Sequence, residues 1–186
     1  MTVTVLPPKL APPGALDVTS RSTTWARAFS PFLLGPVPIN GTTARRVENA
    51  WQYSKVYPEH VDADGLPTQD YLRWRDAGYA RDRAERYPMG KGAVPLFAWL
   101  NDTAFSYIRA RSCLYMPMYA WAVRQTPEWS KLRALYAQEK QLTLVDFDAY
   151  DHRRLGFNWP QVVLCESRKK GLGFVLAMKL EGVYAD

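Results

Sequence analysis

Glu48-Asn-Ala-Trp51-Gln52-Tyr-Ser-Lys55 brings an acid, an aromatic ring, an amide and an amine into eight residues of this chain. An α-helix turns about 100° per residue, so Glu48, Gln52 and Lys55 would lie within about 60° of one another on one face. We therefore predict a helix over residues 44–57, with Trp51 at the edge of the polar stripe. Such a face either forms the wall of a pocket or is a polar face turned to solvent.

The composition predicts a folded protein with anionic partners. The 24 Lys and Arg residues exceed the 18 Asp and Glu residues, which gives a net charge of +6. A surface of this charge favours nucleotides, nucleic acid or phosphorylated metabolites. Cys113 and Cys165 are far apart and form no CxxC pattern, so we expect a reducing, cytoplasmic environment and no zinc site. Apolar runs stay well below 18 residues, so no membrane partner is expected.

The domain organisation is predicted from proline content and residue pattern. Five proline and glycine residues in the first fourteen positions indicate an extended N-terminal arm over residues 1–24. Residues 25–186 are predicted to form one domain, since 186 residues suit a single core. Helical patterns prevail in this range, so we expect a mainly α fold, that is, an α+β domain with a few short strands.

Two further helices are predicted from their capping residues. Thr68 is a natural N-cap for a helix over residues 68–86, whose mixed charges suit a solvated face. Asn101-Asp102 can cap a long helix over residues 103–125, in which Pro117 should cause a kink.

The pattern Glu-x-x-x-Gln-x-x-Lys in residues 48–55 resembles the opening of the NADAR/YbiA-like N-glycosidase superfamily. In that family, a segment of the type F-L-S-N-F and a glycine precede E-H-x-x-Q-x-x-K. Here Phe29-Ser-Pro-Phe32-Leu-Leu and Asn40-Gly41 precede the motif in the same order. Asn49 stands where the family has His.

A second half of the family pattern is found towards the C-terminus. Leu144-Val145-Asp146 and Asp151 keep the family's acid-to-Asp interval of five, with Asp in place of Glu at the first position. Gly156 lies near the expected Gly, although the Trp before it is missing. The stretch Lys170–Met178 is similar to the closing pattern G-x-N-x-L-G-x-x-L-M. The resemblance thus covers residues 29–180 and implies a single YbiA-like domain.

The resemblance implies cleavage of a C–N glycosidic bond. This reaction needs a proton donor for the leaving base, negative charge near the oxocarbenium-like sugar and a nucleophile at C1. Glu48 and Asp151 are the expected carboxylates. Lys55 either attacks C1 to form a Schiff-base-type intermediate or binds a phosphate. The implied substrate is a ribosylated or ADP-ribosylated base, free or on nucleic acid, and no cofactor or metal is required.

Other residues are predicted to bind the substrate. A tryptophan can stack on a base, a Gly-Lys-Gly turn can approach a phosphate, and arginines in an aromatic-rich helix can hold a pyrophosphate. These candidates are Trp51, Gln52, Lys91, Trp99, Arg109 and Arg111.

Two other functions fit parts of the sequence. The positive charge and the aromatic content also suit a non-catalytic protein that binds nucleotides or nucleic acid. A predicted strand over residues 142–147 ends in Asp146-Phe-Asp148, which resembles the first motif of haloacid-dehalogenase-type phosphotransferases that use Mg²⁺.

Overall fold

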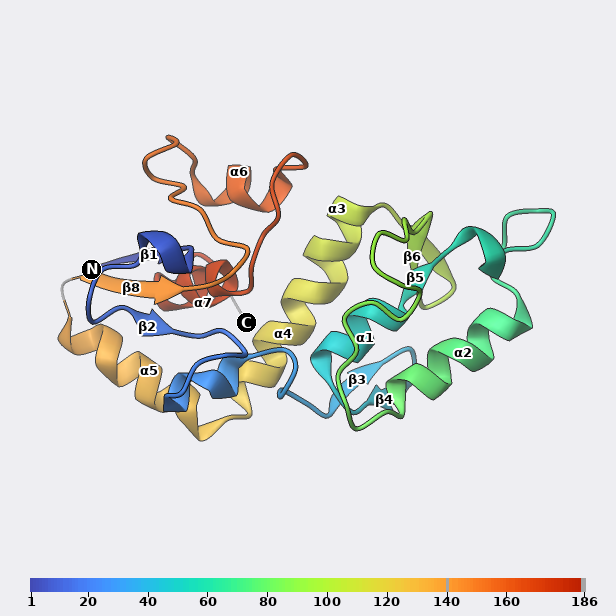
Figure 1. The fold of residues 1–186 in the computed structure, drawn as a ribbon, viewed down its shortest axis with the longest axis horizontal. Coiled ribbons are helices and arrows are strands. Elements are labelled where there is room, and N and C mark those ends of the chain that lie inside the picture. Colours follow the sequence, from blue (N-terminus) through green and yellow to red (C-terminus); the bar gives the residue numbers. More distant parts are fainter. Residues whose placement is uncertain (140, 185–186) are drawn as a thin grey trace. The chain divides into compact units, whose positions relative to one another are not determined.

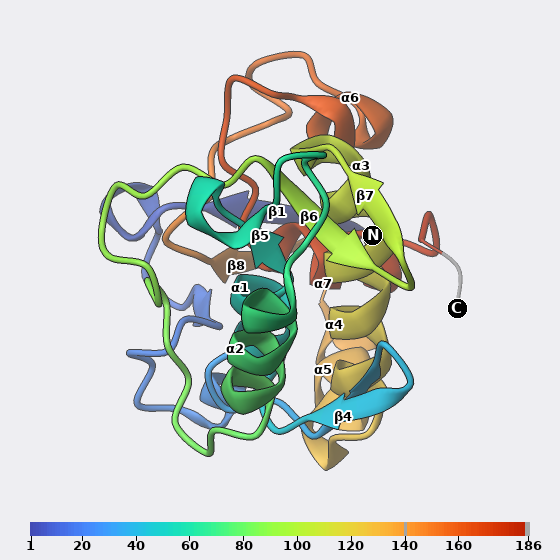
Figure 2. The ribbon, with the colours of Figure 1, turned by 90° about the vertical axis from the view of Figure 1, so that its right-hand side faces the viewer.

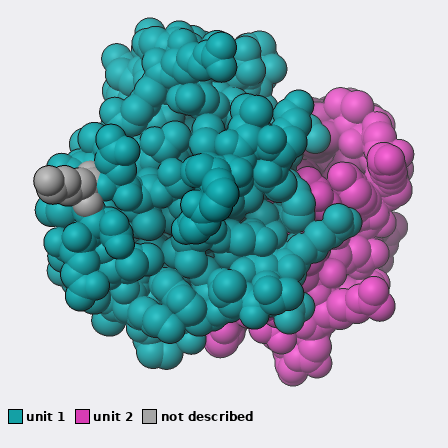
Figure 3. Space-filling view, turned by 60° about the vertical axis from the view of Figure 1, so that its left-hand side comes forward, with its two compact units in different colours: residues 1–30, 119–186 teal, residues 31–118 magenta. Residues whose placement is uncertain are grey.

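The computed structural model describes residues 1–139 and 141–184 and divides the chain into two compact units (Figures 1 and 3). Unit 1 comprises residues 1–30 and 119–186, and unit 2 comprises residues 31–118. The boundary predicted after residue 24 therefore falls inside unit 1. Residues 140, 185 and 186 of the predicted range 25–186 lie outside the described residues.

Unit 1 is built on a parallel sheet in the order β1-β8-β2. Val3 and Val5 of β1 are fully buried, because α7 packs against β1 and β8. The predicted arm over residues 1–24 thus contributes two strands to this sheet. The elements are β1 (Thr2–Leu6), the 3-10 helices η1 (Pro8–Leu10) and η2 (Trp25–Phe29), β2 (Leu16–Asp17), α5 (Pro127–Gln138), β8 (Gln141–Val145), α6 (Trp159–Leu164) and α7 (Gly173–Leu180).

Unit 2 combines a hairpin, a three-stranded antiparallel sheet in the order β5-β6-β7 and the helix pair α1 and α2 (Figure 2). A turn at Asn40-Gly41 joins β3 to β4, and both turn residues have positive φ, as is usual for an Asn-Gly hairpin turn. The elements are β3 (Val37–Ile39), β4 (Thr42–Ala44), α1 (Val47–Tyr53), β5 (Lys55–Val56), the 3-10 helix η3 (Pro58–His60), α2 (Gln69–Tyr79), β6 (Phe97–Leu100), β7 (Thr103–Phe105), α3 (Tyr107–Ala110) and the π-helical turn η4 (Arg111–Tyr115). The helix α4 (Met116–Arg124) carries the chain from unit 2 into unit 1.

The prediction of a mainly α fold is wrong. The chain is an α+β protein with about 40% helix and 16% strand, and the strands form several sheets. Strands of two to five residues give little periodic signal, and prolines surround several of them. The pairing of β1 with β8 joins residues about 140 positions apart, which local pattern does not reveal.

The long helix predicted over residues 103–125 begins later than expected. Asn101 and Asp102 have φ values of 46° and 57° and form the turn between β6 and β7 instead of a helix cap. The helical segment starts after Ser106, whose side chain accepts a hydrogen bond from the Arg109 N–H. A π-helical turn lies just before Pro117, and the Met116 N–H donates to the Arg111 carbonyl. Since Pro117 has no N–H, this wider turn accommodates it.

The helix predicted over residues 68–86 is also shorter than expected. Thr68 is its N-cap, as predicted, and its hydroxyl accepts from the Tyr71 N–H at 3.2 Å. The helix ends at Tyr79, so residues 81–86 form an irregular segment. Within the described ranges, no helix has both the length and the apolar composition of a membrane span.

Candidate functional site

A chain of hydrogen bonds joins Glu48, Gln52 and Lys55 in unit 2. The Gln52 Nε2 donates to Glu48 Oε1 at 2.9 Å, and the Lys55 Nζ donates to Gln52 Oε1 at 2.7 Å. The sequence prediction placed all three residues on one helix, but α1 ends at Tyr53 and Lys55 belongs to β5. The amide of Gln52 therefore links an acid on the helix to an amine on the strand.

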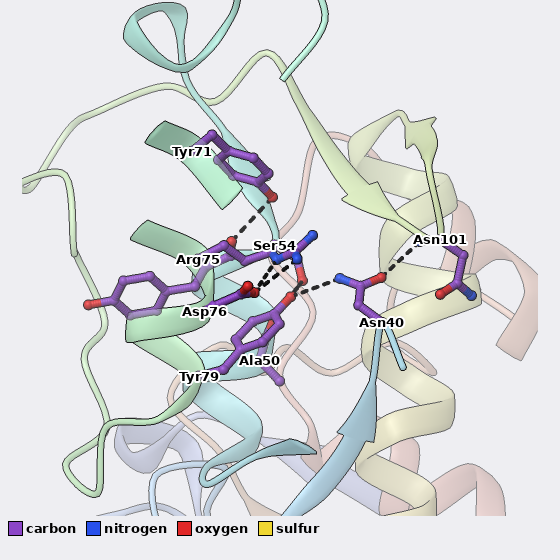
Figure 4. A network of polar contacts seen from close by, with 9 residues as sticks. Asn40, Ala50, Ser54, Tyr71, Arg75, Asp76, Tyr79 and Asn101 are labelled. Atoms are coloured by element: carbon purple, nitrogen blue, oxygen red, sulfur yellow. Dashed lines mark hydrogen bonds and ion pairs between the residues drawn. The ribbon is translucent and has the colours of Figure 1, made fainter. Parts of the chain in front are cut away.

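A buried polar network fixes the junction between α1 and β5 (Figure 4). The Ser54 Oγ donates to the Ala50 carbonyl at 2.7 Å and lies 2.7 Å from the Tyr79 hydroxyl. The Tyr79 hydroxyl accepts from the Asn40 Nδ2 at 3.2 Å. The Trp99 N–H donates to the Ser54 carbonyl at 2.7 Å, which directs the chain into the sheet. The backbone before Lys55 is thus held from the helix and from the sheet.

Aromatic side chains surround the polar chain. Trp51 stacks on Tyr115 with a centroid distance of 4.6 Å and an interplanar angle of 16°. The Lys55 Nζ lies 5.0 Å from the centroid of the Trp51 ring. The Tyr115 hydroxyl is 3.5 Å from Glu48 Oε2, a long contact for a hydrogen bond. Tyr107 extends the cluster at 6.2 Å from Trp51, and its own ring is half exposed.

Burial moves the acid and the amine towards their neutral forms. Desolvation raises the pKa of Glu48, and the hydrogen bond from Gln52 and the charges of Lys55 and Arg86 only partly offset this effect. Desolvation lowers the pKa of Lys55 to about 8, with a further lowering by Arg86 and an opposing effect of Glu48. A buried acid and an amine whose pKa is lowered to about 8 are suited to proton transfer and nucleophilic attack.

The other predicted substrate-binding residues of unit 2 differ in their placement. Arg111 is buried, with its guanidinium 5.5 Å from the centroid of the Tyr107 ring. Arg109 is exposed, and its guanidinium lies over the Phe105 ring. Lys55 pairs with Ala98, and Ala98 pairs with Phe105, so the side chains of these three residues lie on the same face of the sheet. Trp99 lies on the opposite face of β6 from Ala98. Lys91 is exposed in a turn.

The sequence interpretation missed Tyr115, Tyr107 and Arg86 as neighbours of the motif. Arg86 was assigned to a continuous helix, whereas the structure places it beyond the end of α2. The only sequence signal that the helix ends before Arg86 is the Pro and Gly content of the residues that follow Arg86. Tyr115 lies in the π-helical turn, a feature that is frequent at functional sites but that the sequence does not reveal.

Asp151, the second predicted carboxylate, belongs to unit 1, whereas Glu48 and Lys55 belong to unit 2. Its Oδ1 accepts from the Arg154 N–H at 3.0 Å, a local turn contact. The structure therefore joins two of the three predicted catalytic residues and leaves the third as a prediction.

Asp146, the centre of the phosphotransferase alternative, makes contacts typical of a helix-capping residue. Its Oδ2 accepts from the Gly173 N–H at 2.7 Å at the start of α7, and its Oδ1 accepts from the Asp148 N–H at 3.1 Å. A Cβ added at Gly171 would lie 2.5 Å from the carboxylate. Within the part of the chain that the structure describes, no group of three or more His, Cys, Asp or Glu side chains could hold a metal ion.

Comparisons with known proteins place the chain in a family without assigning an activity. No curated protein and no solved structure gives a significant match. One family model matches residues 8–153, which include the Glu48–Lys55 motif and Asp151. Since this match covers most of the sequence, the chain belongs to the family described as "Family of unknown function (DUF6939)".

Proposed function

We propose that the Glu48–Gln52–Lys55 site cleaves the C–N glycosidic bond of a ribosylated or ADP-ribosylated base. The reaction class comes from the resemblance of residues 48–55 to the N-glycosidase motif. The observation that carries the proposal is the polar chain itself. It sets a buried acid and a weakly basic amine at the two ends of one amide, beside a stacked pair of aromatic rings.

Glu48 is proposed as the proton donor. A departing base must leave as a neutral species, so it needs a proton as the bond breaks. Burial raises the pKa of Glu48, which increases the fraction of the carboxyl group that is protonated near neutral pH. Gln52 and Tyr115 contact its two oxygens and hold the carboxyl group in place.

Lys55 is proposed as the nucleophile. Its neutral Nζ attacks C1, the bond to the base breaks with its electron pair going to the base, and the base takes a proton from Glu48. The Glu48 carboxylate then takes one Nζ proton, and the second passes to the ring oxygen as the bond between C1 and that oxygen breaks, which gives an imine between Nζ and C1. Water then adds to C1 and releases the sugar, which regenerates the amine. The pKa of about 8 supports this step, because a sizeable fraction of the amine is uncharged at mildly alkaline pH.

The aromatic cluster and the nearby arginines are proposed to bind a nucleotide-like substrate. The half-exposed Tyr107 ring offers a stacking face next to Trp51, and Arg109 is an exposed cation on the Lys55 side of the sheet. A cytoplasmic location and a catalytic contribution of Asp151 remain parts of this proposal.

The proposal is tested by incubating the purified protein with NAD-derived and nucleic-acid-derived ADP-ribosylated bases and measuring base release by chromatography. Glu48→Gln and Lys55→Arg should each lower the rate by about 100-fold or more, since general acids and nucleophiles contribute effects of this size. Asp151→Asn tests separately whether unit 1 supplies the second carboxylate. Wild-type rates in both unit 2 variants would exclude the mechanism. Salt-dependent binding of DNA or RNA without any turnover would favour the non-catalytic alternative.

A further inference from the structure

A one-way chain of hydrogen bonds links a hairpin turn of unit 2 to the end of helix α1 (Figure 4). The Asn101 N–H donates to Asn40 Oδ1 at 2.8 Å, so the Asn40 Nδ2 faces Tyr79 and donates to its hydroxyl at 3.2 Å. At the other end, the Ser54 Oγ uses its proton on the Ala50 carbonyl at 2.7 Å. The bond of 2.7 Å between Ser54 and Tyr79 therefore requires the Tyr79 proton. The backbone groups at the two ends thus make Tyr79 the donor to Ser54.

The chain also completes a ring of contacts around Ser54. The Ser54 carbonyl accepts from the Trp99 N–H at 2.7 Å, and Asn101 lies two residues further along, in the turn that follows β6. This part of the sheet therefore holds Ser54 twice, directly at its carbonyl and through Asn40 and Tyr79 at its hydroxyl. Because Ser54 and Tyr79 are both buried, their bond cannot be exchanged for a bond to bulk water.

The residue that directly follows Ser54 is Lys55, and its side chain reaches back to the helix. Its Nζ donates to Gln52 Oε1 at 2.7 Å and lies 5.0 Å from the centroid of the Trp51 ring. Both partners are on α1, whereas Lys55 is on β5. The amine reaches them because the chain turns at Ser54, so the contacts that fix Ser54 also fix the place of the amine.

We propose that Tyr79 is a positioning residue of the Glu48–Gln52–Lys55 site, which acts through Ser54 on the place of the Lys55 amine. Burial raises the pKa of Tyr79 to about 12, so its hydroxyl remains a donor over the pH range in which Lys55, with a pKa of about 8, loses its proton. This inference rests on the proposed function for the reaction of the amine, but the place of the amine does not depend on turnover.

The test compares Tyr79→Phe with Tyr71→Phe by the reactivity of Lys55 towards a small uncharged acylating reagent between pH 6.5 and 10. Peptide mass spectrometry gives the midpoint of the reactivity curve at this one lysine. Tyr79→Phe loosens the turn at Ser54 and lets water reach the amine. The midpoint should therefore rise by about 0.5–1 pH unit, within the spread of lysine pKa values in folded proteins.

Tyr71→Phe is the matched control, because it removes another buried hydroxyl of helix α2. The Tyr71 hydroxyl donates to the Tyr53 carbonyl at 3.3 Å and not to Ser54. Its loss should leave the Lys55 midpoint at the wild-type value. A wild-type midpoint in Tyr79→Phe overturns the proposal, and so does an equal rise in Tyr71→Phe, since general loosening of unit 2 would then explain the result.

Ser54→Ala tests whether Tyr79 acts through Ser54. This variant removes the acceptor of the same bond and should also raise the Lys55 midpoint. The double variant Tyr79→Phe/Ser54→Ala should show no larger rise than Ser54→Ala, because both changes break one bond. A rise equal to the sum of the two would exclude action through Ser54. If Tyr79→Phe does not fold, Ser54→Ala decides alone, and an unchanged midpoint in this variant overturns the proposal.

The base-release assay separates the positioning from the reaction. Tyr79→Phe should lower kcat by about 10-fold or more and leave KM within about twofold, because a displaced nucleophile loses transition-state contacts and not substrate binding. Tyr71→Phe should keep both constants near the wild-type values. A raised midpoint in Tyr79→Phe together with no base release by the wild type would exclude the reaction but leave the positioning in place. Base release together with an unchanged midpoint in Tyr79→Phe would exclude only the positioning.

Discussion

The Lys55 Nζ donates to Gln52 Oε1 at 2.7 Å, across the point where helix α1 gives way to strand β5. This contact directs the amine towards a neutral amide and not directly towards the Glu48 carboxylate. Gln52 uses its other amide atom on Glu48, so one side chain separates the two charges and also connects them. A direct ion pair would keep the amine protonated, whereas this arrangement leaves burial to lower its pKa.

Replacement of Gln52 by Met should destabilise unit 2 by about 1–3 kcal/mol, because it leaves Glu48 and Lys55 without their shared partner at nearly the same side-chain volume. The free energy of unfolding from urea denaturation measures this change. Gln69→Met is the control, since Gln69 is an exposed residue of the same unit and should change stability by less than about 0.5 kcal/mol. Equal effects in the two variants would mean that the polar chain does not stabilise the unit.

The raised pKa of Glu48 predicts a pH-dependent stability difference. A carboxyl group whose pKa is higher in the folded state contributes stability fully below its unfolded value of 4.5, and this contribution is lost as pH rises through the folded pKa. Glu48→Gln keeps an acceptor for Gln52 and removes the charge. It should therefore become more stable relative to the wild type as pH rises from 4.5 to neutrality.

Urea denaturation at several pH values between 4 and 7.5 gives this difference directly. Glu59→Gln is a suitable control, because Glu59 is an exposed carboxylate of the same unit. A stability difference for Glu48→Gln that stays constant over this range would contradict the assignment of a raised pKa. If the variant is both more stable and inactive, the acid is retained for chemistry at a cost in stability.

The sequence predicted the geometry of the motif only in part. The spacing of Glu48 and Gln52 predicted that they share one face of a helix, and in the structure both lie on α1 and form a hydrogen bond. Lys55 was placed on the same helix, and the error has a local cause. Ser54 bonds back to Ala50 and presents its carbonyl to Trp99, a residue that no helical periodicity connects to it.

The remaining parts of the site depend on contacts between distant residues. Tyr115 reaches Glu48 across 67 positions, and Asn49 reaches Glu85 across 36. In the sequence, Asn49 stands out only because the N-glycosidase motif that residues 48–55 resemble has His at this position. Its amide donates to the carbonyls of Arg81 and Arg83 and accepts from the Glu85 N–H, and a single sequence cannot show this structural role. The turn at Asn40-Gly41 and the N-cap at Thr68 were predictable because each depends on a few adjacent residues.

Asp146 is expected to stabilise unit 1 and not to bind magnesium. Asp146→Ala removes the acceptor of the Gly173 N–H and the cap of α7, which should cost about 1–3 kcal/mol. Thermal unfolding with and without magnesium chloride measures the effect. The wild type should show the same transition in both buffers. A magnesium-dependent rise in the wild type that disappears in Asp146→Ala would restore the phosphotransferase alternative.

Gly78 of α2 lies directly against the Tyr53 ring of α1, so its replacement by Ala should lower stability although Ala is the better helix former. A Cβ added at this position would lie 2.0 Å from the Tyr53 ring, which is itself fully buried. Gly→Ala in an exposed helix interior stabilises by about 0.5–1 kcal/mol. Here Gly78→Ala should destabilise unit 2 by about 1–3 kcal/mol, because Tyr53 or the helix must move.

Displacement of Tyr53 also has a consequence for the residues that follow α2. Its hydroxyl donates to Glu85 Oε2 at 2.6 Å, so Gly78→Ala should also weaken the attachment of Glu85 to α1. Ala77→Gly is the control on the exposed side of α2, where only the propensity cost of about 0.5–1 kcal/mol applies, and urea denaturation compares the two variants. Stabilisation by Gly78→Ala would show that the two helices have room between them, and the packing that positions the segment Arg81–Glu85 would need another explanation.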